Sequence, residues 1–282
     1  MAYIFPKKIF PNNLNSYLLC PFKFKCQNDK EIKVEFIESP QTFVGKVVHM
    51  VLKNLFDIEK VLVNERKNQD LANMVRYSWA RMPKNGKNKG YWGKEDRRKV
   101  FGSEEKEKAF GLNTISMISN YISSANLSAT PMFLEDWMEC SAGNFTIAGR
   151  VDRVDQDSQS SISVWDYKTG KLPFYKSMEK IIEKDIQIPM YAVISSKNNL
   201  FAKKIRAGFI YVKYSKVYEI TWNRDELKKV EEKIISIIKE AQNDKALLPR
   251  INSLCGWCQY KNICPAKKSI EEKEKKVEDV SW

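Results

Sequence analysis

The sequence predicts an α/β fold in which strands and helices share one large domain. Apolar and polar residues alternate over 149–152 and 164–168, as in half-buried strands, and a polar stretch over 156–161 separates the two. Apolar residues recur at helical spacing between Thr42 and Asp57, which predicts an amphipathic helix. With 282 residues, 43% of them hydrophobic, the chain is long enough for a single domain with a large core.

The first half of the chain is predicted to be mainly helical. Residues 14–26 read as a short helix or turn, and the amphipathic helix follows. The only histidine, His49, lies at the edge of that helix's apolar stripe, one turn after Gly45. By itself, a histidine there is typical of a packed or solvated side chain rather than a ligand. Residues 60–128 are rich in charge and are also predicted to be mainly helical.

The second half alternates strands with helices. A β-rich centre is predicted from about Phe133 to Thr169, and a helix from about Asp185 to Ser196. The next elements predicted are strands near Ala207–Tyr214 and Val217–Trp222 and a helix over about Arg224–Asn243. The last segment, 267–282, alternates in charge and is expected to be an exposed helix or a frayed tail.

The charge of the chain favours a polyanionic partner. Lys and Arg number 48 against 35 Asp and Glu, a net charge of +13. Such an excess suits nucleic acid first and an anionic membrane surface second. No apolar stretch approaches the length that spans a membrane, and Pro and Asn residues interrupt any signal-peptide core. We therefore expect a cytoplasmic protein without a membrane partner, in which thiols stay reduced.

The two central strands gather charged side chains on one face of a hairpin. Asp166 and Lys168 are two residues apart, so they project from the same side of their strand. Asp152 joins them if the register pairs even-numbered residues with even-numbered ones. Carboxylates so close repel each other unless a cation or proton intervenes, which indicates a divalent-metal site beside a lysine. The alternative is a solvated surface hairpin, but Val164 and Trp165 favour a buried strand.

A basic loop with aromatic residues lies within the helical region. It could grip phosphates while an aromatic side chain stacks on a base, or it could be a solvated excursion. The sequence favours neither reading. The candidate DNA-binding residues are Lys84, Lys87, Lys89, Tyr91, Trp92, Arg97 and Arg98.

Three of the six cysteines form a close group near the C-terminus. Cys255, Cys258 and Cys264 have C-x2-C-x5-C spacing, which suits an iron–sulfur cluster or a structural zinc. A triplet followed by proline is more typical of a cluster. Cys20, which also precedes a proline, is the better candidate for a fourth ligand, although Cys26 competes with it. Such a centre would tie both ends of the chain together around the central sheet.

In combination, these segments resemble the RecB-type branch of the PD-(D/E)XK nucleases that carries an iron–sulfur cluster. CRISPR-associated and exonuclease V-like cluster nucleases are its nearest members. The order and combination of the motifs are specific, although no single motif is. The motifs are Cys20-Pro21, Gly45…His49, Gly149-Arg150-Val151-Asp152, Asp166-Tyr167-Lys168, Gln187…Tyr191 and Cys255…Cys258…Cys264-Pro265. Val151 stands in place of the proline in the superfamily's name, a substitution common within this branch.

The resemblance implies a fold and a domain plan. The core would be restriction-endonuclease-like, with a mixed central sheet flanked by helices, in a single nuclease domain over residues 1–282. Residues 60–128 would be a helical insertion. Residues 250–266, joined with Cys20, would hold a [4Fe–4S] cluster, and 267–282 would be a charged tail.

The resemblance also implies roles for the site residues. The implied metal ligands are His49, Asp152, Asp166 and the backbone carbonyl of Tyr167. Lys168 would be the catalytic lysine that orients the attacking water, and Gln187 and Tyr191 would position the substrate or that lysine. The ion would be Mn²⁺ or Mg²⁺, and an imidazole ligand suits Mn²⁺ better. Phosphodiester hydrolysis would leave a 5′-phosphate and a 3′-hydroxyl.

The expected substrate is DNA, single-stranded or at its ends, cleaved by exonuclease or single-strand endonuclease action. DNA repair, recombination and CRISPR or phage defence are all compatible pathways, with protein partners in a repair or CRISPR adaptation complex. The alternative function is a catalytically silent protein that binds DNA or acts as a scaffold. The intact acid, lysine and histidine set argues against it. The direction of cleavage along the DNA strand, the biological pathway and the oligomeric state do not follow from the sequence.

Overall fold

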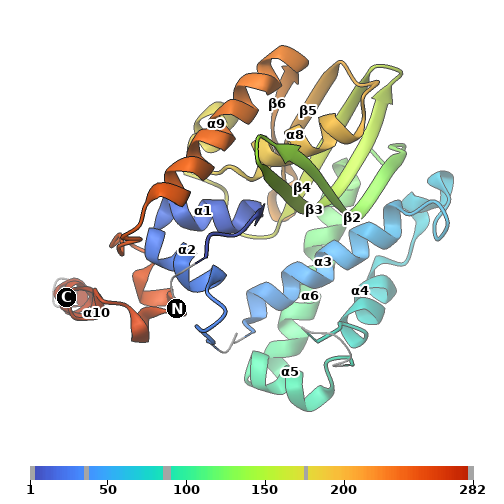
Figure 1. The fold of residues 1–282 in the computed structure, drawn as a ribbon. Helices are drawn as coiled ribbons and strands as arrows, with labels where there is room; N and C mark the ends of the chain where they lie inside the picture. Colours follow the sequence, from blue (N-terminus) through green and yellow to red (C-terminus); the bar gives the residue numbers. More distant parts are fainter. Residues whose placement is uncertain (1–3, 35–37, 85–89, 175–176, 279–282) are drawn as a thin grey trace.

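A six-stranded mixed sheet forms the centre of the molecule (Figure 1). The computed structural model describes residues 4–34, 38–84, 90–174 and 177–278, the stretch 273–278 by its backbone alone. The strand order is β1-β3-β4-β5-β6, and β2 pairs with β3 in addition. Two pairs are parallel, β1–β3 and β4–β5, and the others are antiparallel, so the predicted mixed sheet is confirmed. The strands are β1 (Lys8–Ile9), β2 (Pro131–Ala142), β3 (Phe145–Ser158), β4 (Ser161–Lys168), β5 (Lys204–Tyr211) and β6 (Lys216–Asn223).

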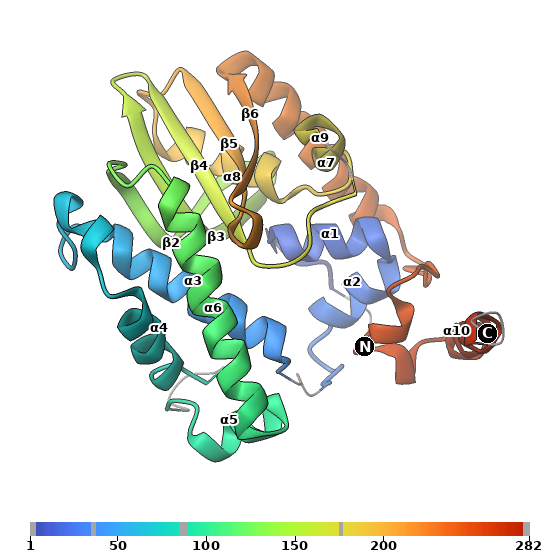
Figure 2. The same ribbon diagram turned by 180° about the vertical axis from the view of Figure 1, so that it is seen from behind.

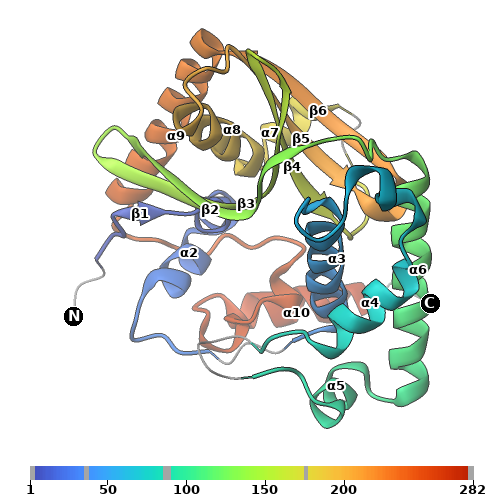
Figure 3. The same ribbon diagram turned by 90° about the vertical axis from the view of Figure 1, so that its right-hand side faces the viewer.

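Helices cover both faces of this sheet, as the same prediction expected. The α-helices are α1 (Pro11–Leu19), α2 (Pro21–Asn28), α3 (Pro40–Phe56), α4 (Leu71–Ala80), α5 (Lys94–Phe101), α6 (Glu104–Ser124), α7 (Met178–Ile182), α8 (Gln187–Asn198), α9 (Arg224–Asn243) and α10 (Lys267–Glu278). Short 3-10 helices are η1 (Val63–Asn68), η2 (Val212–Tyr214), η3 (Cys255–Trp257) and η4 (Lys261–Ile263). Figure 3 shows α8 and α9 on one side of the sheet and α3 and α6 on the other.

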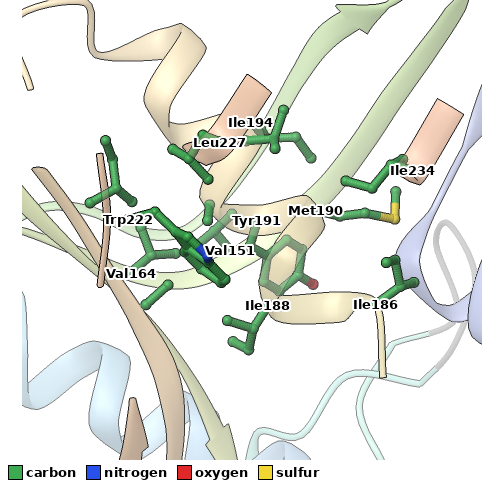
Figure 4. Close-up of a cluster of buried hydrophobic side chains, with 14 of the residues drawn as sticks. Val151, Val164, Ile186, Ile188, Met190, Tyr191, Ile194, Trp222, Leu227 and Ile234 are labelled. Atoms are coloured by element: carbon green, nitrogen blue, oxygen red, sulfur yellow. The ribbon is translucent and has the colours of Figure 1, made fainter. Parts of the chain in front are cut away.

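Strand β4 is buried on both faces because its alternate side chains enter two different cores. Trp165 and Tyr167 pack in the core formed with α3, α4 and α6. Figure 2 shows these three helices from the side opposite to that of Figure 1. Ile162 and Val164 pack in the core beneath α8 and α9. Figure 4 shows part of the second core, where Tyr191 of α8 lies among side chains from the sheet and from α9. Polar side chains on β4 therefore need partners within the protein.

The hairpin of β3 and β4 has the register that the predicted metal site requires. Arg153 pairs with Trp165 and Val154 with Val164, so even-numbered residues face even-numbered ones. Continued by one residue, this register sets Asp152 opposite Asp166. The condition on which the predicted metal site depended is met.

Several element boundaries differ from those predicted. Residues 14–26 fall in two helices, α1 and α2, each beginning at a proline and joined at Cys20. Strand β5 ends at Tyr211 instead of continuing to Tyr214, because the chain enters the 3-10 turn η2. Ser215 then reverses the chain with a φ of 48°. No glycine or proline marks that turn in the sequence, which is why the strand was predicted too far along.

Segments from both ends of the chain lie side by side. Helix α2 lies next to the segment that carries η3, η4 and α10 (Figure 1). The backbone N–H of Arg250 donates to Sγ of Cys20, a contact of 3.4 Å. None of the helices in the described ranges is long and apolar enough to cross a membrane.

Candidate metal centre

Four elements bring the predicted site residues to one place. Helix α3 supplies His49, strand β3 supplies Asp152, strand β4 supplies Asp166 and Lys168, and helix α8 supplies Gln187. These elements are close because β3 and β4 are paired, and because α8 and α3 cover opposite faces of the sheet. Residues separated by more than a hundred positions in the sequence therefore form one cluster.

His49 is the centre of the first group of contacts. Its Nδ1 lies 2.9 Å from Oε1 of Glu135 and 3.3 Å from Oδ1 of Asp152. Its Nε2 lies 3.1 Å from the backbone carbonyl of Tyr167. Asp152 is held in turn by the backbone N–H of Tyr167, which donates to its Oδ2 at 2.7 Å. Three possible ligand atoms lie within 4.8 Å of one another, one each from His49, Glu135 and Asp152.

Gln187 links the second group of contacts. Its Nε2 donates to Oδ1 of Asp166 at 2.7 Å and to the hydroxyl of Tyr191 at 3.3 Å. Its Oε1 accepts a hydrogen bond of 2.7 Å from Nζ of Lys168. The same Nζ lies 2.8 Å from Oδ2 of Asp166. The side chains of Asp166, Lys168, Gln187 and Tyr191 thus form one network.

The donor set fits a divalent cation. Oδ2 of Asp166 is buried, and among the described residues it has no partner with hydrogen-bond geometry, although Lys168 lies in ion-pair contact. A buried oxygen of this kind is costly unless a ligand satisfies it. The imidazole, carboxylate and carbonyl donors of His49, Glu135, Asp152 and Tyr167 suit Mn²⁺, and Mg²⁺ also takes carboxylate and carbonyl oxygens. The compact group of possible ligands in the described residues is His49, Glu135 and Asp152, with the Tyr167 carbonyl next to His49. Asp166 as a further ligand stays a prediction.

The protonation equilibria reflect the crowding of charge. Burial raises the pKa of Asp166 to about 6, with Lys168 opposing the rise and Asp152 adding to it. Burial would lower the pKa of His49, but its hydrogen bonds with Asp152 and Glu135 outweigh this and raise it. The pKa of Lys168 is also raised, because Asp166 outweighs the effect of burial. The lysine is therefore an ammonium in the absence of a metal.

Glu135 is a site residue that the sequence did not reveal. It lies within the predicted β-rich centre, Phe133 to Thr169, but belongs to none of the motifs. It lies on β2 between two residues whose partners on β3 flank Asp152. Its φ is 54°, a left-handed conformation that is uncommon without glycine or asparagine. Nothing in the neighbouring residues signals that kink, and a regular strand would give no reason to single out this glutamate.

Gly149 explains part of the motif that precedes Asp152. A Cβ atom at this position would lie 2.6 Å from Cε1 of Tyr191. Only glycine lets the tyrosine ring of α8 lie so close to strand β3. The glycine at position 149 thus leaves room for the ring of Tyr191, whose hydroxyl contacts Gln187.

The predicted DNA-binding loop is partly engaged in the fold. Lys87 and Lys89 lie outside the described residues. Lys84 is ion-paired with Asp96, and Arg98 with Glu104. Trp92 packs against Phe43 in the helical core. Nη1 of Arg97 donates to the backbone carbonyl of Trp92. Nε of Arg97 contacts Glu107 as well, whereas Tyr91 and Arg98 are exposed. A DNA-binding role for this loop stays a prediction.

Four cysteines line one cavity of about 330 Å³. They are Cys20, Cys255, Cys258 and Cys264. The three charged residues of the lining, Lys23, Arg250 and Lys261, are all basic. Backbone N–H groups donate to Sγ of Cys20 and of Cys255. Cys26 is not among the lining residues and is only 2% exposed. Burial raises the pKa of its thiol to about 11, with a further contribution from Cys258.

Comparisons with known proteins concern both the family and the fold. The sequence profile of the PD-(D/E)XK nuclease superfamily matches residues 10–265 of the chain. A protein from Eubacterium rectale described as a "putative exonuclease" has a similar structure, with a TM-score of 0.52 and 12% identity. The match covers 90% of this chain and 88% of that one. SSO0001 is 16% identical over 93% of this chain and 87% of its own, with a TM-score of 0.38. A search of curated protein sequences finds no match.

Proposed function

The chain belongs to the PD-(D/E)XK nuclease superfamily, and from this premise we propose that it is a metal-dependent deoxyribonuclease. The observation that carries the proposal is the convergence of Asp152, Asp166 and Lys168 with His49 at one end of the β3–β4 hairpin. A decayed relative with only a binding role would be expected to lose one of these groups. All of them are present, and each contacts another member of the set.

The chemistry divides between the ion and the side chains of this chain. A bound Mn²⁺ or Mg²⁺ would neutralise charge on the phosphoryl oxygens and activate water at neutral pH. Asp152, Asp166, His49 and the Tyr167 carbonyl would hold the ion, and Glu135 would keep Nδ1 of His49 in place. Because an imidazole ligand suits Mn²⁺, activity with Mn²⁺ is expected to be at least comparable to that with Mg²⁺.

Lys168 is proposed to act as a positioned ammonium. Its contacts with Asp166 and Gln187 fix Nζ next to the metal ligands. From there it can donate hydrogen bonds to the attacking water and to a phosphoryl oxygen. Because Asp166 raises its pKa, it would hold its proton unless the bound cation lowers that pKa. Gln187 holds both groups, and Tyr191 supports Gln187.

The proposed substrate is DNA, single-stranded or at ends, cleaved to 5′-phosphate and 3′-hydroxyl products. The net charge of +13 supports a polyanionic substrate. Repair, recombination and CRISPR or phage defence, in the cytoplasm, are the settings we propose. The domain plan inferred above, with 60–128 as an insertion in a single nuclease domain, belongs to the same proposal.

A [4Fe–4S] cluster held by Cys20, Cys255, Cys258 and Cys264 is proposed as a structural staple. Two observations support it: the four cysteines line one cavity, and backbone N–H groups point at two of the sulfurs. Four thiolates carry negative charge, which the basic lining would offset. A structural zinc is the alternative, and a brown colour that bleaches on oxidation would exclude it.

The decisive comparison for the function is between the native chain and two variants, Asp166→Ala and Lys168→Ala. We expect cleavage of end-labelled single-stranded DNA by the native chain in Mn²⁺ or Mg²⁺, and no cleavage by either variant. Both variants should still fold and bind DNA. Unchanged cleavage by both variants would overturn the proposal. Tight, salt-dependent DNA binding without cleavage by the native chain would favour the scaffold instead.

A further inference from the structure

An exposed tryptophan lies next to the candidate centre on strand β2. The side chain of Trp137 is 57% exposed, although large aromatic residues are usually well buried. Its ring is nevertheless held in place. The ring of Phe10 lies 5.5 Å away at an interplanar angle of 58°.

Arg150 connects this tryptophan to the candidate centre. Trp137 and Arg150 are direct cross-strand partners, so their side chains project from the same face of the β2–β3 pair. Nε of Arg150 lies 2.9 Å from Oε2 of Glu135 and donates to the Glu135 backbone carbonyl at 3.0 Å. Glu135 in turn contacts His49. Two contacts therefore separate Arg150 from a proposed metal ligand.

The guanidinium of Arg150 still has donors to offer. Its side chain is 60% exposed, and its contacts within the described residues are made through Nε. The two terminal amino groups form the planar fork that recognises phosphate oxygens in bidentate fashion. An exposed aromatic ring beside such a fork is the combination that binds single-stranded nucleic acid.

We propose that Trp137 and Arg150 form a subsite for one nucleotide of single-stranded DNA next to the scissile phosphate. This inference rests on the proposed nuclease function. The base would stack on the open face of Trp137, and the adjoining phosphate would bind the terminal amino groups of Arg150. Trp137 is two residues from Glu135 on β2, about 7 Å along a strand. That is a distance which one nucleotide of an extended single strand can span.

A paired base could not use this subsite. In a duplex, the faces of each base are covered by its neighbours, so stacking on Trp137 requires an unstacked base. The subsite therefore selects single-stranded DNA or frayed ends. It supplies a structural reason for a substrate preference that the resemblance alone had suggested.

The chain contains a matched control for this aromatic and cationic pair. Tyr77 on α4 is 53% exposed, close to the value for Trp137, and it too has an arginine neighbour. The guanidinium of Arg81 lies over the Tyr77 ring, 4.7 Å from its centroid, so that face is covered. Tyr77→Ala thus removes an exposed aromatic side chain of similar exposure without touching the proposed subsite.

The test is DNA binding by the full chain in chelator, where no cleavage occurs. Anisotropy would be measured with a labelled oligo-dT and with an abasic phosphodiester chain of equal length. Trp137→Ala should weaken oligo-dT binding about 5- to 100-fold and leave the abasic chain unaffected. Trp137→Phe should restore most of the loss, because it keeps a stacking surface. Arg150→Ala should weaken both ligands and lower the salt slope by about 1.

Two results would overturn the subsite, and they differ in what else they overturn. If oligo-dT binds but Trp137→Ala has no more effect than Tyr77→Ala, the subsite is wrong and the nuclease proposal stands. If the native chain binds neither ligand at low salt and cleaves no DNA in Mn²⁺, the proposed function fails together with the subsite.

Discussion

Gln187 joins the two charged groups of β4 through one side-chain amide. Its oxygen accepts from Lys168, and its nitrogen donates to Asp166. Removing it would leave a buried carboxylate and an ammonium free to take other positions. Neighbours that orient metal ligands are typically worth 10- to 100-fold in activity or metal affinity.

We therefore predict that Gln187→Ala lowers the single-turnover cleavage rate about 10- to 100-fold while the protein stays folded. Gln156→Ala is the control, because within the described ranges the only hydrogen bond of the Gln156 side-chain amide is to the backbone carbonyl of Ser158, at the exposed end of the hairpin. Equal rates for the two variants would mean that Gln187 plays no positioning role.

The protonation of Asp166 should make metal affinity depend on pH. The cation binds the carboxylate form, and burial raises the pKa of Asp166 to about 6 without metal. Below pH 6 a proton must leave before the ion binds, so this group should lower the affinity up to about tenfold per pH unit. Above about pH 7 its contribution should vanish.

Calorimetric titration with Mn²⁺ between pH 5 and 8 checks this. Proton release, read from the dependence of the heat on the buffer, should accompany binding at low pH. His49, whose pKa is also raised, should add to the same trend. A Mn²⁺ affinity that does not change between pH 5 and 7 would contradict the assignment of Asp166 as a ligand.

At the scale of elements, the sequence predicted best where local pattern and tertiary packing agree. Helix α9 has the predicted bounds, Arg224–Asn243, because the Asn223 side chain caps its first turn. The alternating side chains and the polar turn predicted the hairpin, and its register was the condition for the predicted site, which the pairing of β3 and β4 meets. Glu135 could not be predicted, because its role depends on a left-handed residue inside β2. A strand pattern carries no signal for such a kink.

The back of the hairpin holds a buried ion pair that should matter for stability. Arg153 bonds Asp155 through Nε at 2.9 Å and Nη2 at 2.7 Å, and donates to the Tyr167 hydroxyl. Arg206 makes a more exposed pair with Asp157 on the same sheet, at 3.2 Å. Breaking a buried ion pair leaves a buried charge without a partner, which is strongly destabilising. An exposed ion pair contributes little to stability.

We predict that Arg153→Met lowers the free energy of unfolding by about 3–5 kcal/mol. The matched substitution Arg206→Met should cost no more than about 1 kcal/mol. Urea unfolding of both variants measures the difference. Equal losses would show that the buried Arg153–Asp155 pair contributes no more to stability than the exposed Arg206–Asp157 pair.

At the scale of the whole molecule, the two ends of the chain meet at the cysteine cavity. The spacing of three cysteines predicted an inorganic centre, but spacing alone could not choose between Cys20 and Cys26. In the fold, Cys20 stands between α1 and α2 and lines the cavity, whereas Cys26 is buried in α2. That difference depends on how two helices dock against the C-terminal segment, which no local pattern encodes.

Substituting the cysteines one at a time should separate ligands from packing residues. Cys20→Ser, Cys255→Ser, Cys258→Ser and Cys264→Ser should each lose iron, sulfide and visible absorbance. Cys26→Ser should keep all three, because its thiol lies beside the cavity and does not line it. Loss of iron in Cys26→Ser but not in Cys20→Ser would reverse the assignment.

The central claim is that this site cleaves DNA by means of a divalent ion held by Asp166 and its neighbours. The most direct measurement is the single-turnover cleavage rate of end-labelled single-stranded DNA as Mn²⁺ is titrated into chelator-treated protein. We predict a saturable rise for the native chain and a rate at least about 100-fold lower for a folded Asp166→Asn variant. Cleavage that persists in excess chelator, or that is equal in the two proteins, would contradict it.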